Sequence, residues 1–149
     1  MNDNHHPLGD PLDGIALPRL GFSAAALVAI FIGGAIGTVA RFLLDSSHAT
    51  PSGHFPLTTL VINLSGSLAI GLLVPLVERM QQRIPWGRPF LIVGLLGGWT
   101  TYSTLAVDAV QLGRGSHVAI GLAYLAATVA GGVALVVVGD ALGRRVVRP

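Results

Sequence analysis

Four long apolar stretches, separated by short polar connections, constrain this 149-residue chain more than any other feature. Each stretch approaches the roughly 20 residues that an α-helix needs to cross the hydrocarbon core of a bilayer. They run over about residues 23–44, 57–77, 89–112 and 118–138. Backbone polar groups in lipid must find hydrogen bonds within their own segment, so we predict four transmembrane helices. The fold class expected is an all-α integral membrane protein in contact with lipid.

Composition excludes the main alternatives to a membrane protein. Only 11% of the residues are charged and 52% are hydrophobic, whereas a soluble domain has roughly 25% charged residues. A disordered chain would be rich in charge and poor in apolar residues. The absence of cysteine excludes disulfides, thiolate metal sites and a cysteine nucleophile. The net charge is only +2 and no basic patch forms, so we expect no nucleic-acid partner.

The chain is expected to divide into three parts. Residues 1–20 carry three prolines and lack the basic start of a secretory signal, so we interpret them as a disordered tail. His5 and His6 in this tail are interpreted as solvent-exposed residues and not as metal ligands. Residues 21–142 form the four-helix membrane domain, and residues 143–149 form a basic C-terminal tail.

The arginines predict how the chain is oriented, because all nine basic residues are arginine. With four spans, Arg41 and Arg114 fall on one side of the membrane. The other seven share the opposite side and are Arg19, Arg79, Arg83, Arg88, Arg144, Arg145 and Arg148. The positive-inside rule then places both termini in the cytoplasm. We expect a multi-pass protein of the cell's inner (plasma) membrane.

The first two spans each contain polar or small residues that need an explanation. Gly33 and Gly37 form a GxxxG pair, which is typical of closely packed membrane helices. Arg41 has two open interpretations: it extends to the lipid headgroups, or it holds a positive charge in a vestibule that concentrates an anion. Asn63 in the second span either bonds a neighbouring helix or donates hydrogen bonds to an ion. We favour the ion because of the third span.

The third span is a poor sequence for a continuous helix. Gly97 and Gly98 are followed by hydroxyl residues at 100, 101, 103 and 104. Glycine pairs cost backbone entropy, and Ser and Thr offer the backbone competing hydrogen bonds, so we predict a break near Gly97–Thr101. Exposed carbonyls at a break suit a hard cation such as Na⁺, and the hydroxyls suit an anion or water. Asp108 is interpreted as a helix-terminal or vestibule residue and not as a proton-coupling carboxylate.

Tyr124 and Thr128 share one face of the fourth span, because they are four residues apart. They either extend a polar track or bond a neighbouring helix. All five histidines lie outside the spans, and no nucleophile has a base beside it, so we do not expect an enzyme. These features together indicate passage of something small.

The stretches GGAIGTVAR, TLVINLSGSLAIG and GLLGGWTTYST resemble, in order, the signature stretches of the Fluc (CrcB) fluoride channels. The resemblance spans about residues 24–142. It implies an antiparallel, dual-topology dimer with two fluoride pathways, which exports cytoplasmic fluoride passively. It further implies that the carbonyls of Gly97 and Thr100 hold a structural Na⁺ at the dimer centre, and that Arg41 is the family's first-helix arginine. The pathway residues implied by position are Asn63, Tyr102, Ser103, Thr104, Leu105, Tyr124 and Thr128.

Two features depart from the family pattern. Tyr102 and Leu105 stand where the family usually has phenylalanines, so one of two aromatic positions in the pathway is lost or relaxed. The arginines are unevenly divided, whereas a chain that inserts in both orientations should have balanced loops. A homodimer and a heterodimer with an oppositely oriented paralogue, in which this chain is a non-conducting or partner-dependent subunit, both remain open.

Two other classes fit the sequence less well. A small four-helix multidrug exporter needs a glutamate in its first helix, and residues 23–44 contain no acidic residue. A subunit that serves only packing would explain the glycines but would leave Asn63 and the hydroxyl residues without a role.

Overall fold

The computed structural model describes residues 23–48, 54–114 and 118–147, and all regular structure in these ranges is helical. The elements are α1 (Ala24–Ser47), α2 (Leu57–Met80), the π-helix η1 (Pro89–Leu96), α3 (Gly97–Trp99), α4 (Tyr102–Gly113) and α5 (Val118–Val147). Four stretches are long and apolar enough to cross a membrane: α1, α2, Pro89–Gly113 and α5. The all-α prediction with four spans is confirmed. The predicted tail with His5 and His6 lies outside the described residues.

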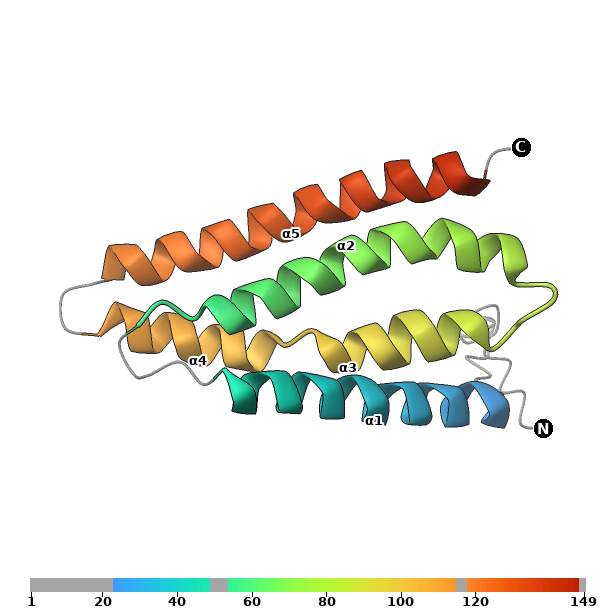
Figure 1. Cartoon of the computed structure of the whole chain (residues 1–149), viewed down its shortest axis with the longest axis horizontal. Coiled ribbons are helices and arrows are strands. Elements are labelled where there is room, and N and C mark those ends of the chain that lie inside the picture. Colours follow the sequence, from blue (N-terminus) through green and yellow to red (C-terminus); the bar gives the residue numbers. More distant parts are fainter. Residues whose placement is uncertain (1–22, 49–53, 115–117, 148–149) are drawn as a thin grey trace, which may run out of the picture.

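The helices run back and forth in one elongated bundle (Figure 1). Helix α1 packs on η1 and α3, while α5 packs on α2 and α4. The start of α1, the turn between α2 and η1, and the end of α5 all lie at the same end of the bundle. Because α1 contacts η1 and α3 whereas α5 contacts α4, the main neighbour of the third span changes from α1 to α5 along its length.

The contact between α1 and η1 depends on glycine. Gly33 and Gly37 are buried, and a Cβ atom on them would overlap the carbonyl oxygens of Phe90 and Leu95. On the opposing helix, a Cβ on Gly94 would lie 2.7 Å from the carbonyl oxygen of Ile30. Both backbones meet without side chains between them, which confirms the packing role predicted for the GxxxG pair.

The last helix is longer than predicted. The apolar stretch ends near Val138, but α5 continues to Val147 and so includes most of the predicted basic tail. Hydropathy marks only the part of a helix that suits lipid, and a helix can continue beyond it where its polar side chains support each other. Here Asp140 and Arg144, four residues apart, form an ion pair of 2.7 Å.

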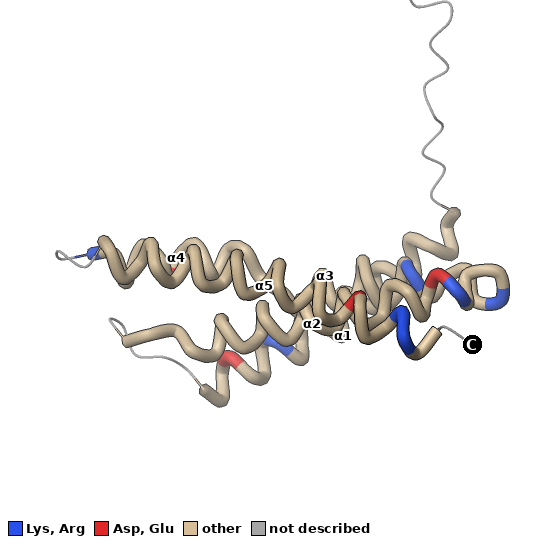
Figure 2. The backbone as a smooth tube through the Cα atoms, turned by 90° about the horizontal axis from the view of Figure 1, so that it is seen from above, with Lys and Arg blue, Asp and Glu red and all other residues tan. Residues whose placement is uncertain are grey.

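Basic residues gather at one end of the bundle (Figure 2). The arginines at the end where α5 finishes are Arg79, Arg83, Arg88, Arg144 and Arg145. Arg114 lies at the opposite end, and Arg41 lies on α1. The described residues thus carry the charge asymmetry that the sequence predicts.

Candidate functional site

The third span is interrupted at Thr100 and Thr101, which confirms the predicted break near Gly97–Thr101. Helix α3 ends at Trp99 and α4 begins at Tyr102. Between them, Thr100 has φ −72° and ψ 155°, and Thr101 has φ −144° and ψ 124°, so both are extended. An extended backbone at this depth needs hydrogen-bond partners other than its own helix.

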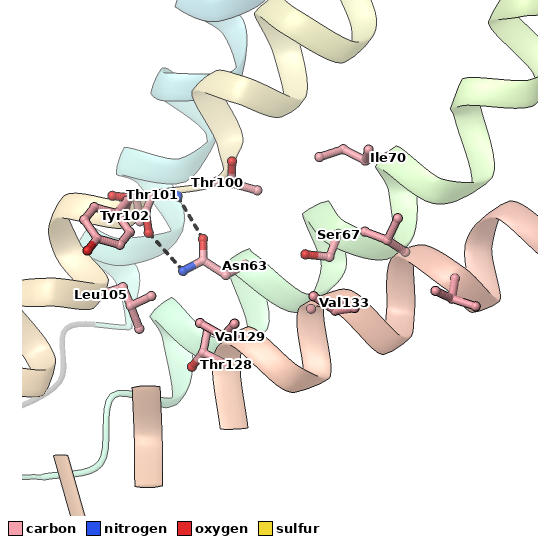
Figure 3. Close-up of a pocket in the computed structure, with 13 residues that line it drawn as sticks. Asn63, Ser67, Ile70, Thr100, Thr101, Tyr102, Leu105, Thr128, Val129 and Val133 are labelled. Carbon is pink, nitrogen blue, oxygen red and sulfur yellow. Dashed lines mark hydrogen bonds between the residues drawn. The ribbon is translucent and has the colours of Figure 1, made fainter. Parts of the chain in front are cut away.

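Asn63 of α2 supplies those partners (Figure 3). Its Nδ2 donates to the carbonyl oxygen of Thr101 at 2.9 Å, and its Oδ1 accepts from the amide of Thr101 at 2.8 Å. One side chain therefore satisfies both backbone polar groups of an extended residue. The amide nitrogen of Asn63 carries a second hydrogen, which these two bonds do not use. Asn63 thus makes the interhelical contact that was one of its two interpretations.

Thr101 connects the predicted hydroxyl residues. Its Oγ1 accepts from the amide of Thr104 at 3.2 Å and donates to the hydroxyl of Thr104 at 3.0 Å. It also lies 3.2 Å from the hydroxyl of Ser103. The sequence pattern alone predicts no separate role for Thr101. A threonine just before an apolar helical run is, however, a recognised N-cap signal, and this one caps α4.

The break frees two backbone carbonyls. The amide of Thr101 bonds Asn63 and not Gly97, and the amide of Thr104 bonds the Thr101 side chain and not Thr100. Among the described residues, no hydrogen bond ends on the carbonyl oxygen of Gly97 or of Thr100. Free carbonyls at a helix end carry partial negative charge. The two positions that the resemblance assigns to Na⁺ therefore fit a hard cation, which prefers oxygen ligands.

Arg41 also contacts the break. Its Nε donates to the carbonyl oxygen of Gly98 at 3.1 Å, and the residue is half-buried. The guanidinium therefore lies at the C-terminal end of α3, where a cation interacts favourably with the helix dipole. This is a structural role that neither sequence interpretation of Arg41 included.

A groove opens beside the break (Figure 3). It has a volume of about 470 Å³ and lies between α2, the start of α4 and α5. Its lining residues are Asn63, Ser67, Ile70, Thr100, Thr101, Tyr102, Leu105, Thr128, Val129, Gly132, Val133, Val136 and Val137. The polar side chains of Asn63, Thr100 and Thr101 gather beside the break, and valines line the part further along α5. Tyr102 on its rim is 81% exposed. The groove also contains Ser67, which was not predicted as a site residue.

Tyr124 and Thr128, the two polar residues of the predicted fourth span, are placed differently from each other. Thr128 lines the groove, but it is 5% exposed and its hydroxyl donates to the carbonyl of Tyr124 at 2.8 Å. Tyr124 is 1% exposed and does not line the groove. It packs with Leu105, Ala109 and Leu112, among others, so in the single chain it belongs to the α4–α5 core.

Asp108 and Phe55 complete the surroundings of Tyr124. The tyrosine hydroxyl donates to Asp108 Oδ2 at 3.4 Å, and the ring meets Phe55 edge to face with centroids 5.5 Å apart. Asp108, for which the sequence predicts a helix-terminal or vestibule position, is half-buried and has Tyr124 as a side-chain partner. Leu105 contacts this core and also lines the groove.

The fold and the site together define a class: a four-span membrane protein whose third helix is broken beside a polar groove. The profile of one family, described as CrcB-like protein, Camphor Resistance (CrcB), matches residues 28–140. This match covers most of the chain and all four spans. The chain belongs to the CrcB-like family.

Curated relatives extend this result. A protein of Nocardia farcinica named fluoride-specific ion channel FluC 2 is 42% identical over 120 residues, which are 80% of this chain and 86% of that protein. The fluoride-specific ion channel FluC of Agrobacterium fabrum is 42% identical over 80% of this chain and 94% of its own length. That of Paracoccus denitrificans is 37% identical, over 77% and 91% respectively. All three relatives are named as channels, and this chain is a multi-pass membrane protein of their family.

Proposed function

We propose that this chain forms a fluoride-selective channel, through which cytoplasmic fluoride leaves the cell passively and its toxicity is lowered. The observation that carries the proposal is the break at Thr100 and Thr101, which Asn63 holds open beside a groove. The relatives of this chain are named fluoride-specific ion channels. The family relationship and the polar end of the groove therefore support one function.

The chemistry of the groove suits a small anion. Fluoride is strongly hydrated, and a pore must replace its water with closely placed hydrogen-bond donors. The unused hydrogen of Asn63 Nδ2 is such a donor in the groove, and the hydroxyls of Ser103 and Thr104, which do not line the groove, lie next to it, within hydrogen-bond distance of Thr101. None of these groups carries a charge that would trap the ion. The edge of the Tyr102 ring carries positive potential and adds a further attractive group. Leu105 offers no such edge.

A second chain is part of the proposal. In a single chain the groove is open on one side, and Tyr102 at its rim is largely exposed. An antiparallel partner that covers this face would enclose the pathway. The free carbonyls of Gly97 and Thr100 in both chains would hold a structural Na⁺, which would neutralise the negative helix ends. The basic end of the chain favours one orientation in the inner membrane, so the partner is either a second copy or an oppositely oriented paralogue.

Ion efflux from liposomes that contain only this purified chain tests the proposal. A fluoride electrode and a chloride electrode record release from matched vesicles. We expect rapid release of fluoride without release of chloride. If this chain alone is inactive, the assay is repeated with a paralogue whose arginines favour the opposite orientation. Release of fluoride only from the mixture would show that the channel is a heterodimer. Release of neither ion in both arrangements would contradict the proposed function.

A further inference from the structure

A second groove lies at the basic end of the bundle, far along α2 and α5 from the break. It has a volume of about 580 Å³ and lies between the C-terminal ends of these two helices. It is lined by Leu76, Arg79, Met80, Gln82, Arg83, Val146 and Val147. None of these residues lines the groove beside the break. Conduction as proposed above leaves this feature without a role.

Helix lengths place this groove at the level of the lipid headgroups. Helix α5 has 30 residues, which at a rise of about 1.5 Å each extend about 45 Å. The hydrocarbon core of a bilayer is only about 30 Å thick. Trp86, in the turn after α2, is 54% exposed and meets Phe90 edge to face. Exposed tryptophan is typical of the membrane–water interface, so the neighbouring groove lies where phosphate groups are found.

The lining of the groove combines two charges with an apolar wall. Arg79 and Arg83 supply the charges, and Leu76, Met80 and the two valines supply the wall. Among the described residues, neither arginine forms an ion pair, and the ion pair in α5 joins Asp140 to Arg144. Arg79 donates through Nη1 to the carbonyl of Val147 and so connects α2 to α5. A guanidinium has five donors, so most of its capacity remains for a ligand.

We propose that this groove binds an anionic phospholipid of the phosphatidylglycerol type. The phosphodiester accepts hydrogen bonds from Arg79 and Arg83, since guanidinium groups match the geometry of phosphate. The glycerol and the first acyl carbons lie along Leu76, Met80 and Val146. Basic pockets between transmembrane helices on the cytoplasmic side are suited to acidic headgroups. Free phosphate would leave the apolar wall without a contact, so the ligand is a lipid.

Native mass spectrometry of the delipidated, purified chain tests this site. Phosphatidylglycerol and phosphatidylcholine with the same acyl chains are added back, and the bound lipid is counted. We expect the wild type to retain phosphatidylglycerol preferentially. The double variant R79Q/R83Q should lose roughly tenfold or more of this retention, since each arginine at the surface contributes severalfold. The matched double variant R88Q/R145Q removes equal charge from the same end outside the groove, and should change retention less than twofold.

Several outcomes would overturn the site. Equal retention of both lipids by the wild type would exclude a site that selects an acidic headgroup. An equal loss of phosphatidylglycerol in both double variants would show that the overall positive charge of this end, and not the groove, attracts the lipid. Displacement of phosphatidylglycerol by millimolar inorganic phosphate would show that the apolar wall contributes nothing. If R79Q/R83Q does not fold, R83Q replaces it, because Arg83 follows the end of α2 and takes no part in the contact with Val147. We expect R83Q to lose about fivefold.

Discussion

The two halves of the third span pack on their neighbours in different ways. The half before the break, η1 and α3, meets α1 through Gly33, Gly37 and Gly94, with backbone against backbone. The half after the break, α4, meets α5 through the side chains of Leu105 and Tyr124, and at its far end through backbone, where a Cβ on Gly121 would lie 2.6 Å from the carbonyl oxygen of Ala109. Backbone contacts cannot adjust to an added atom, whereas side chains can repack. The first half is therefore fixed by backbone contacts up to the break, whereas α4 tolerates change at its side-chain contacts, away from Gly121.

The largest effect is expected at the backbone contact. In Gly37→Ala the new Cβ would overlap the carbonyl oxygen of Leu95 and lie 2.9 Å from the amide nitrogen of Trp99. We expect a loss of about 3 kcal/mol in the free energy of unfolding, measured by denaturation in detergent micelles. Gly34→Ala is the matched control, because its Cβ would lie 3.9 Å from its nearest neighbour, the carbonyl oxygen of Gly94. Equal losses in both variants would show that the close contact does not constrain the fold.

Arg41 tests whether the first half is also held at its end. Arg41→Gln removes the charged donor to the carbonyl of Gly98 and should cost about 1 kcal/mol. Arg41→Lys keeps the charge but loses the planar Nε donor. If the hydrogen bond matters most, fluoride efflux should fall in both variants. Full efflux in Arg41→Lys together with loss in Arg41→Gln would favour the vestibule interpretation, in which only the charge attracts the anion.

The smallest effect is expected in the second half. Tyr124→Phe removes the hydroxyl that reaches Asp108 at 3.4 Å but retains the ring beside Phe55. Because this hydrogen bond is long, we expect a loss of about 0.5 kcal/mol or less. Thermal denaturation of both proteins in the same detergent measures the difference. A loss as large as that in Gly37→Ala would mean that α4 is held as rigidly as η1.

Much of this fold follows from residue patterns. The four spans follow from apolar length, the close α1–η1 contact from Gly33 and Gly37, and the break from Gly97, Gly98 and the threonines. Each of these features depends on the size and polarity of the side chains within one short segment. The π-helical form of Pro89–Leu96 was not predicted, because its apolar sequence carries no signal that separates it from an α-helix.

The site was predicted less completely than the fold. Asn63 stands out in the sequence because an amide within a membrane span needs a partner, but its partner, Thr101, is 38 residues away in the sequence. Only the packing of α2 on the break brings them together. Tyr124 matched a pathway position by resemblance, yet it lies in the core of the single chain. The sequence spacing of Tyr124 and Thr128 gives a shared helix face but not the neighbour that covers it.

Fluoride efflux from liposomes that contain Asn63→Ala tests the central claim most directly. This variant removes both hydrogen bonds to Thr101. Each bond contributes about 1 kcal/mol. If the two bonds hold the conducting arrangement, their loss corresponds to a roughly 30-fold fall in fluoride efflux. Thr58→Val is the matched control, because it removes a hydrogen bond that the same helix donates to the carbonyl of His48, the residue after α1, away from the break. Asn63→Ala should still fold and assemble, with efflux reduced by this factor, while Thr58→Val conducts as the wild type does. Unchanged fluoride efflux in Asn63→Ala would contradict the assignment of the break as the conducting site.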